Sequence, residues 1–322
     1  MQKVLVTARS FGNVSNEPLN VLRAAGLDVI TLGGRASETM DDLLPNLRDV
    51  SAMIISREPI TDEVFAHAPN LKIVVKHGVG VDNIDIAAAA KRNIVVANTP
   101  GANKLSVAEL AVNGMLALSR QLLWANNSVR RGNWETLVGQ NLSEKTVGIV
   151  GLGNIGSSTA RILQGFRCRL LAYDPYISNE QFAAAGATSV SYEQLVQESD
   201  HITLHVPLTS ETRHMVDTAV FAGMKTTAFL INVARGGVVD EWALAAALED
   251  GQIAGALVDV FEQEPPDTGH PLFQAPNTLF TPHTGAHTRE SMSNMSLMAA
   301  QNVVDVLQGR PCPNQVFPNT GS

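Results

Sequence analysis

The apolar positions of this chain fall into short runs that alternate with longer, helix-like stretches. The runs are almost wholly apolar and do not alternate apolar with polar residues, which is typical of strands covered on both faces. Such strands form parallel sheets with crossover helices, so the pattern predicts an α/β fold. The expected strands are 4–7, 29–32, 52–56, 73–76 and 94–97, followed by 147–150, 170–173, 202–206, 229–233, 257–260 and 279–281.

Four longer stretches have the periodicity of helices. One spans 154–166, and another spans 240–249 with Asp240 as its expected N-cap. Residues 105–123 are apolar on nearly all sides, which predicts one long buried helix. A final helix is expected over 288–307.

Two breaks in this pattern divide the chain. The segment Asn98-Thr99-Pro100-Gly101 interrupts it before the apolar helix, and Gly285 interrupts it before the last helix. We therefore expect two domains, one made of residues 1–100 and 288–322 and the other of residues 101–287. Both are expected to be Rossmann-like or flavodoxin-like, with parallel sheets and an active-site cleft between them.

Composition narrows the class of protein. The chain has 322 residues, 31 acidic against 23 basic side chains and a net charge of −8, which argues against nucleic acid or a membrane surface as partner. The N-terminus has no long apolar run and no small-residue cleavage site, so a cytoplasmic location is expected. The two cysteines are in no CxxC pair and no His/Cys cluster has zinc spacing, so no metal is expected.

A glycine motif, Gly151-x-Gly153-x-x-Gly156, closes an expected strand and opens an expected helix. Gly151 permits the tight turn, Gly153 lets a pyrophosphate approach the backbone, and Gly156 lets the helix pack close to the sheet. The pyrophosphate would lie on amides at the helix N-terminus. The motif alone is weak, because a glycine-rich turn can also bind nothing.

Asp174 strengthens the interpretation, because it ends the next expected strand, 18 residues beyond Gly156. A carboxylate at that place accepts hydrogen bonds from the adenosine ribose and repels a 2′-phosphate. Pro175 and Tyr176 follow, with no arginine to receive such a phosphate. The sequence therefore predicts NAD as the cofactor, in preference to NADP, and makes residues 101–287 the NAD-binding Rossmann domain.

Three residues with reactive or charged side chains follow expected strands of that domain: Arg235 after 229–233, a carboxylate after 257–260 and His283 after 279–281. Ligands of open parallel sheets bind at this edge. Oxidation of a 2-hydroxy acid needs a base for the hydroxyl proton, a carboxylate to orient that base and a fixed cation for the substrate carboxylate. We assign His283 and Arg235 to the first and last roles; by spacing, Glu262 and Glu264 are equal candidates for the carboxylate.

At these residues the chain resembles the D-isomer-specific 2-hydroxyacid dehydrogenase family, in its phosphoglycerate dehydrogenase-like branch. The resemblance covers almost the whole chain and rests on specific motifs: HGVGVDNID at 77–85, NTPGANKLSVAEL at 98–110, GIVGLGNIG at 148–156, HVPLTSETRHM at 205–215, INVARGGVVDE at 231–241, VDVFEQEPP at 258–266 and TPHTGAHT at 281–288. It implies reversible hydride transfer between NAD(H) and C2 of a small 2-hydroxy or 2-oxo acid.

The resemblance also implies roles for individual residues. It makes Arg235, Glu264 and His283 catalytic, and it selects Glu264 over Glu262. Asp259 would hold the nicotinamide carboxamide. The remaining cofactor contacts are expected at Gly151, Leu152, Gly153, Asn154, Ile155, Gly156, Asp174, Val206, Pro207, Val233 and Ala234. The substrate would be held by backbone of Gly78, Val79 and Gly80, with Arg235 and His283.

The identity of the acid stays open. Phosphoglycerate enzymes often place an arginine where Ile55 stands here, and Arg57 lies two residues later, on the same strand face by period. Arg57 could therefore contact a phosphate or could be a surface residue. The same choice is open for Lys76 and His77, which could contact substrate or could lie at a solvated strand end.

Two other functions remain as alternatives. One is an NAD-sensing binding protein similar to corepressors built on this scaffold, and the other is a dehydrogenase of the formate or phosphite type. The apolar helix at 105–123 and the stretch Trp124–Trp134 favour a homodimer, as in the family. His201, His205 and His214 surround one strand, but we expect no metal there, because they are too far apart to share one ion.

Overall fold

The computed structural model describes residues 1–32 and 43–318. The chain divides into two compact units, unit 1 with residues 1–103 and 286–322 and unit 2 with residues 104–285. These limits differ by a few residues from the expected boundaries after 100 and 287. Residues 33–42 and 319–322, which belong to the expected first domain, lie outside the described residues.

Unit 1 contains a parallel sheet with the strand order β2-β1-β3-β4-β5. This is the flavodoxin-like order, in which the strand order reverses between β1 and β3. Ile55 at the end of β3 is in register with Lys76 at the end of β4, so the loops after both strands leave the same edge. The strands are β1 (Lys3–Val6), β2 (Asp28–Thr31), β3 (Val50–Ile55), β4 (Ile73–Lys76) and β5 (Val95–Ala97).

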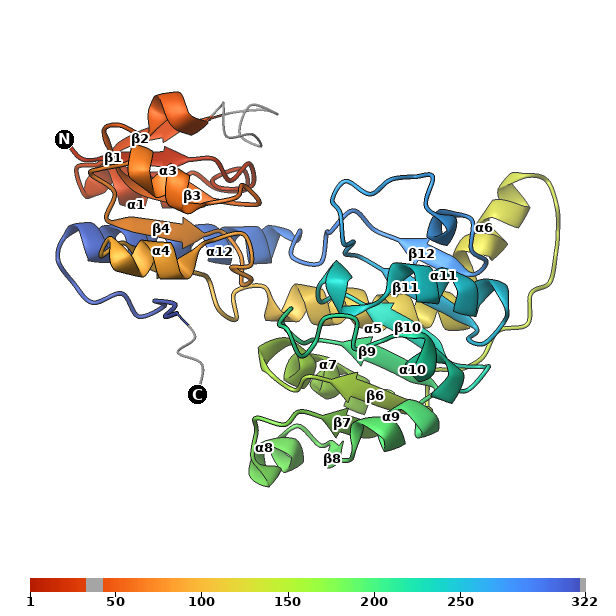
Figure 1. The fold of residues 1–322 in the computed structure, drawn as a ribbon. Coiled ribbons are helices and arrows are strands. Elements are labelled where there is room, and N and C mark those ends of the chain that lie inside the picture. Colours follow the sequence, from red (N-terminus) through yellow and green to blue (C-terminus); the bar gives the residue numbers. More distant parts are fainter. Residues whose placement is uncertain (33–42, 319–322) are drawn as a thin grey trace. The chain divides into compact units, whose positions relative to one another are not determined.

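Helices cover both faces of this sheet (Figure 1). Successive residues of β1 belong to opposite cores: Val4 and Val6 pack under α1 and α12, whereas Leu5 packs with the residues of α3 and α4. Both faces of the sheet are therefore buried, which is why polar and apolar residues do not alternate along its strands. The helices are α1 (Glu17–Ala24), α3 (Asp62–His67), α4 (Ile86–Lys91) and α12 (Arg289–Leu307), with a short 3-10 turn η2 (Leu44–Asn46).

Unit 2 contains a parallel sheet with the strand order β12-β11-β10-β9-β6-β7-β8. The order is that of a Rossmann fold, in which the strand order reverses between β6 and β9. The strands are β6 (Thr146–Val150), β7 (Arg169–Tyr173), β8 (Thr188–Ser189), β9 (His201–Leu204), β10 (Phe229–Asn232), β11 (Gly255–Val258) and β12 (Thr278–Phe280).

Two helical layers enclose this second sheet (Figure 1). On one face α5 packs against α7, β10 and β11, and Gly114 lets it approach closely: a Cβ there would lie 2.3 Å from Cδ2 of Leu257. The other face is covered by α9, α10 and α11. The helices are α5 (Lys104–Ser119), α6 (Leu122–Arg130), α7 (Asn154–Gln164), α8 (Asn179–Ala184), α9 (Tyr192–Glu198), α10 (Thr218–Gly223) and α11 (Glu241–Glu249), with 3-10 turns η3 (Gly236–Val238) and η4 (Pro271–Phe273).

The fold class is as expected, but several element limits were wrong. The single helix expected over 105–123 is two helices, because Gln121 takes a left-handed conformation (φ 49°) between α5 and α6. Strands expected to reach 206 and 260 end at Leu204 and Val258, and the two-residue strand β8 was not expected. Asp240 is the N-cap of α11, as expected, and accepts hydrogen bonds from the amides of Trp242 and Ala243. Across the described residues, no helix combines the length and the apolar character that a membrane span requires.

Candidate active site

In the glycine turn between β6 and α7, only the middle glycine has room for a side chain. Gly151 has φ 87°, and a Cβ on it would lie 2.9 Å from the backbone of His205. A Cβ on Gly156 would lie 2.1 Å from the carbonyl oxygen of Gly151, so α7 is held tightly against the turn. Gly153, the N-cap of α7, faces open space, with nothing within 4 Å of its would-be Cβ. A pyrophosphate group fits over this position, where the helix amides and the dipole favour an anion.

Asp174 lies beside this turn because β6 and β7 pair in register, Val150 opposite Tyr173. Its carboxylate accepts from the amide of Leu152 (2.9 Å) and from the amide of Tyr176 (3.0 Å). These two bonds fix the carboxylate at the lip of the glycine turn and leave lone pairs for ribose hydroxyls. The donor and acceptor set therefore fits the adenosine end of NAD.

His283 and Glu264 form a hydrogen-bonded pair at the carboxyl end of the sheet. Nδ1 of His283 lies 2.9 and 2.8 Å from the two carboxylate oxygens of Glu264. An ionised carboxylate only accepts, so Nδ1 carries the proton and Nε2 is left as the acceptor. The His283 side chain is 35% exposed and that of Glu264 18%, so the imidazole reaches the surface while its partner stays largely covered. Glu262, the other candidate by spacing, pairs instead with Nε2 of His214 at 2.7 Å.

Asp259, buried at the end of β11, fastens the loop that carries His283. Its carboxylate accepts from the hydroxyl of Thr281 (2.6 Å) and from the amides of Thr284 (2.7 Å) and Gly285 (3.0 Å). Its carbonyl oxygen also accepts from the amide of His283, at 2.8 Å. The loop fixes His283 in a left-handed conformation (φ 54°). Asp259 thus has a structural role beside the carboxamide contact that the resemblance implies.

Arg235 leaves the end of β10, the strand next to β11. The buried side chain of Asn232 shapes this turn, because it accepts from the amide of Ala234 (3.1 Å) and donates to the carbonyl of Arg235 (3.1 Å). Gly236 then touches the neighbouring loop: a Cβ on it would lie 1.9 Å from the carbonyl carbon of Phe261. The turn with Arg235 is therefore packed directly on the backbone that leads to Glu264.

The remaining expected cofactor residues lie along the same edge of the unit 2 sheet. Val206 and Pro207 follow β9, and Val206 contacts the glycine turn, since Cγ1 would lie 2.9 Å from a Cβ on Gly151. Val233 and Ala234 follow β10 and are buried. The expected set thus surrounds the point where the strand order reverses, which is where dinucleotides bind in such sheets.

The expected anion-binding loop of unit 1, Gly78-Val79-Gly80, follows β4 and is half-buried. Gly78 has φ 153°, a conformation that favours glycine. Carbonyl oxygens of this loop accept hydrogen bonds from Asn98 and Thr99, beyond the end of β5. Successive small residues of this kind can present backbone amides to an anion.

Lys76 and His77, whose roles were open, both have structural contacts. The Lys76 ammonium bonds to the carbonyl of Ser56 and, at 2.9 Å, to the side chain of Asn83. His77 is buried, with Nδ1 3.1 Å from the Ser10 hydroxyl and Nε2 2.9 Å from the Ser296 hydroxyl. Burial, together with the charges of His287 and Lys76, lowers the pKa of His77 to about 4. The imidazole is therefore neutral at pH 7 and acts as an interior crosslink.

Arg57 is exposed on a loop whose backbone is held by the side chains of Glu58 and Asn83. The buried Glu58 carboxylate accepts from the amide of Ser56 at 2.7 Å, and Asn83 donates to the carbonyls of Ser56 (3.2 Å) and Glu58 (2.6 Å). The loop leaves β3 at the same edge as the Gly78-Val79-Gly80 loop leaves β4. The backbone on both sides of Arg57 is thus held by buried polar contacts.

The three histidines around β9 do not converge. His201 stacks on Phe229 and approaches Ser119, whereas His205 lies 3.1 Å from the Thr203 hydroxyl and His214 pairs with Glu262. Burial lowers the pKa of His201 to about 4 and that of His205 to about 3. Over residues 1–32 and 43–318, no group of three His, Cys, Asp or Glu side chains could hold a metal ion.

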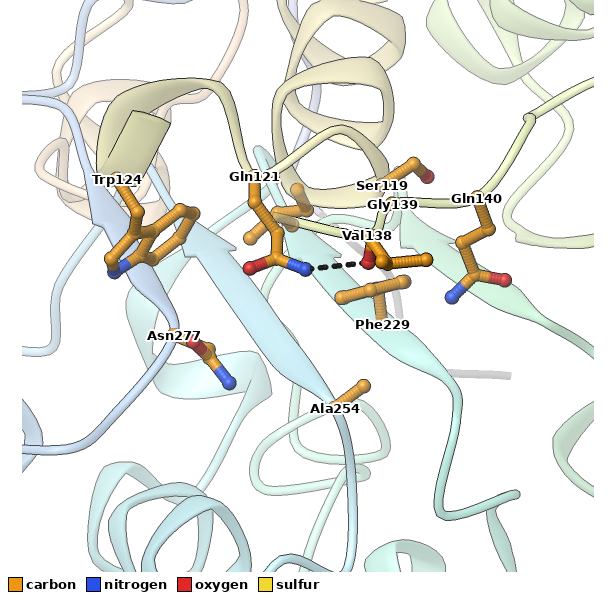
Figure 2. A pocket seen from close by; sticks show the side chains of 10 residues that line it. Ser119, Gln121, Trp124, Val138, Gly139, Gln140, Phe229, Ala254 and Asn277 are labelled. Atoms are coloured by element: carbon orange, nitrogen blue, oxygen red, sulfur yellow. Dashed lines mark hydrogen bonds between the residues drawn. The ribbon is translucent and has the colours of Figure 1, made fainter. Parts of the chain in front are cut away.

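A small cavity of about 200 Å³ lies elsewhere in unit 2 (Figure 2). Phe229, Ala254 and Asn277 line it at the amino ends of β10 to β12, the opposite edge from His283 and Arg235. Gln121 crosses it and donates to the carbonyl of Val138 at 2.9 Å (Figure 2). This cavity is separate from the expected cofactor and catalytic residues.

Comparison with known proteins identifies the family of this chain. Residues 112–285 match the family described as "D-isomer specific 2-hydroxyacid dehydrogenase, NAD binding domain". The chain belongs to this family. Its second unit is therefore the NAD-binding domain of the family, which agrees with the fit of the glycine turn and Asp174.

Individual relatives span several activities. The chain is 39% identical over 305 residues to a D-3-phosphoglycerate dehydrogenase of Archaeoglobus fulgidus, covering 94% of this chain but only 58% of that protein. It is 40% identical over 281 residues to a glyoxylate reductase of Korarchaeum cryptofilum, covering 85% of each. Among solved structures, the TT0316 protein of Thermus thermophilus matches with a TM-score of 0.89 and 34% identity, over 98% of this chain and 100% of that one.

Several residues that shape the site were not expected from the sequence. Asn232, Thr281 and Thr284 hold the loops that carry Arg235 and His283, and Asn98 and Thr99 hold the loop of unit 1. All are polar residues that lie at the end of an expected strand or within three residues beyond it. That position was a usable signal, because a parallel strand ends at the ligand-binding edge.

Proposed function

We propose that the protein is an NAD-dependent D-2-hydroxyacid dehydrogenase, which interconverts a small 2-hydroxy acid and the corresponding 2-oxo acid. The observation that carries the proposal is the Nδ1 contact of His283 with Glu264, 2.8 Å, at the edge of the sheet where Arg235 also emerges. Family membership and the fit of the glycine turn to a dinucleotide support it.

The chemistry assigns one task to each of these residues. In the oxidative direction, the C2 hydroxyl loses its proton to Nε2 of His283 while a C2=O double bond forms. A bound NAD⁺ would supply the acceptor for the hydrogen that leaves C2 with its electron pair. Glu264 holds the imidazole with Nε2 free to take the proton, and it stabilises the imidazolium that results. Arg235 grips the substrate carboxylate and polarises the C2 oxygen.

We propose unit 1 (residues 1–103 and 286–322) as the substrate-binding domain. The amides of the Gly78-Val79-Gly80 loop would bind the substrate carboxylate. Arg57, on its braced loop, would contact a second charged group of the acid, such as the phosphate of a 3-phosphoglycerate-type substrate. A glyoxylate-type acid has no such group, so the substrate decides whether Arg57 takes part.

The experiment is a panel of 2-oxo acids with NADH, followed at 340 nm: glyoxylate, hydroxypyruvate, phosphohydroxypyruvate and 2-oxoglutarate. Turnover of at least one acid that is lost in Arg235→Ala supports the proposal. An unmodified protein that binds NADH but reduces no acid would contradict it and favour an NAD-sensing binding protein. Oxidation of formate or phosphite alone would indicate the third class.

We propose that the active form is a homodimer in the cytoplasm. Large apolar side chains are exposed along α6 and the segment after it: Leu122, Leu123, Val129, Trp134 and Val138. Exposed apolar patches of this kind mark interfaces. Sedimentation at micromolar concentration should give a dimer, and Trp134→Glu with Val138→Glu should give a monomer. Both cysteines are unpaired thiols, which suits a reducing compartment.

A further inference from the structure

The amides of the Gly78-Val79-Gly80 loop are aimed by side chains from outside the loop. The carbonyl of Gly78 accepts from both the amide (2.9 Å) and the hydroxyl (3.0 Å) of Thr99, and the carbonyl of Val79 accepts from the side-chain amide of Asn98 at 2.7 Å. In a trans peptide the N–H points opposite to the C=O. The N–H groups of Val79 and Gly80 therefore point away from Asn98 and Thr99.

These two amides have no acceptor among the described parts of the chain: no hydrogen bond within residues 1–32 and 43–318 uses the N–H of Val79 or Gly80 as donor. Two adjacent backbone donors on a half-buried loop of small residues can bind an anion such as a carboxylate. Because Asn98 and Thr99 hold the carbonyls, they decide the direction of both donors.

Asn98 is itself held by the C-terminal part of unit 1. Its carbonyl accepts from the side chain of Asn302 on α12 at 3.1 Å, and Asn314 donates to the Asn302 side chain at 2.9 Å. The amide of Asn98 donates to the carbonyl of Asn314 at 3.3 Å. Asn302 is only 1% exposed, so the central residue of this network is shielded from water, whereas Asn98 and Asn314 are half-buried.

The tail beyond α12 also pairs with β5. The amide of Val316 donates to the carbonyl of Val96 at 2.7 Å, and Gln315 forms an antiparallel bridge with Ala97. A continuous set of hydrogen bonds thus runs from the tail through Asn302 and Asn98 to the loop at Val79.

We propose that Asn98 and Thr99 are positioning residues for substrate carboxylate binding, and that Asn302 and Asn314 couple the C-terminal tail to this loop. The proposal rests on the proposed function for its substrate but not for its geometry. Loss of a clamp lets the peptide units of the loop rotate, which scatters the two donors without removing them. Affinity for the acid then falls, while the residues that bind NADH and transfer the proton stay in place.

The test compares four variants with a matched control. Asn98→Ala and Thr99→Val remove one clamp each, Thr99→Ser keeps the hydroxyl, and Asn314→Ala acts from the tail. The control is Asn70→Ala, because Asn70 also donates from its side chain to a backbone carbonyl of unit 1, that of Arg48, at 3.2 Å. We expect KM for the 2-oxo acid to rise about tenfold for Asn98→Ala and two- to fivefold for Thr99→Val and Asn314→Ala, with kcat and the KM for NADH within about twofold. Thr99→Ser and Asn70→Ala should leave all three constants unchanged.

A second readout needs no turnover. Hydrogen–deuterium exchange of the peptide that covers residues 77–81 should speed up in Asn98→Ala and Asn314→Ala and stay unchanged in Asn70→Ala. The proposal is overturned if this peptide exchanges at the same rate in all variants, or if KM for the acid does not change in folded Asn98→Ala and Thr99→Val. A protein that reduces no 2-oxo acid but shows the expected exchange would refute the proposed function alone.

Discussion

Glu264 reaches past Glu262 to hold His283: its Oε2 lies 2.8 Å from Nδ1 of the imidazole, while Glu262 pairs with His214. Two similar carboxylates, two residues apart, therefore have different partners in the same loop. The difference provides a matched pair of variants for the catalytic proposal.

Glu264→Gln should lower kcat about 10- to 100-fold, because the amide can no longer stabilise a positive imidazolium, and His283→Ala should lower it by about 10²–10⁴-fold. Steady-state kinetics with the best acid of the panel measures both. Glu262→Gln serves as the control and should keep kcat within about threefold. Equal losses in the two glutamine variants would mean that the pair with His283 has no special role.

Asp174→Ala tests the cofactor assignment. We expect KM for NADH to rise about 10- to 100-fold, since roughly 1.5–3 kcal/mol of charge-assisted hydrogen bonding is lost, while the KM for NADPH changes little because the repulsion of its 2′-phosphate also disappears. The ratio of kcat/KM for the two cofactors is the measurement. Asp217→Ala, at the N-cap of α10 in the same unit, should leave that ratio unchanged. An unchanged ratio in Asp174→Ala would contradict contact with the ribose.

Gly236→Ala should destabilise unit 2 and reduce kcat together, because the new Cβ would lie 1.9 Å from the Phe261 backbone and the turn with Arg235 must move. Overpacking of this kind costs about 1–3 kcal/mol. Thermal unfolding and kcat are to be measured on the same preparation. Gly223→Ala, where the nearest atom would lie 3.4 Å away, should behave like the unmodified protein. A stable, fully active Gly236→Ala protein would show that the contact is not needed.

His77 should make the folded protein sensitive to acid. Its pKa of about 4 lies below the ordinary histidine value of 6.5, so the unfolded chain binds the proton more readily. Stability from this group is complete above pH 6.5 and is lost as pH falls from 6.5 to 4, by at most about 3 kcal/mol. Urea unfolding from pH 8 to 4 measures the slope, and His77→Asn should flatten it. His67→Asn, at an exposed position, should not; equal slopes in all three proteins would contradict the assignment.

Within residues 1–32 and 43–318, the apolar runs predicted all but one strand, because both faces of each sheet are buried and the strands are therefore apolar throughout. β8 was not predicted, because its two exposed residues, Thr188 and Ser189, form no apolar run. The break after α5 escaped because the left-handed residue is Gln121, where neither glycine nor proline signals a stop. In each case the missing information was three-dimensional.

The site, too, could be predicted only in part, because some of its contacts join residues that are far apart in the sequence. The motif positions indicated which strand ends carry chemistry, since parallel topology places all carboxyl ends on one edge. The role of His77 could not be predicted, because one of its partners, Ser296, is 219 residues away. Asn98 looked like a simple turn residue, and only its contacts with Val79 and Asn302 give it another role.

Unit 1 is made of two separate segments of the chain, so it cannot be completed until its C-terminal segment has been synthesised. Unit 2 is one continuous segment, but one face of the first sheet is covered by Ala299, Ala300 and Val303 of α12. Until those residues emerge, Val4, Val6 and Ile54 lack the part of their apolar cover that α12 supplies, although α1 is already present. Part of the apolar face of the N-terminal strands therefore stays exposed through most of translation, and transiently exposed apolar surface of this kind favours aggregation.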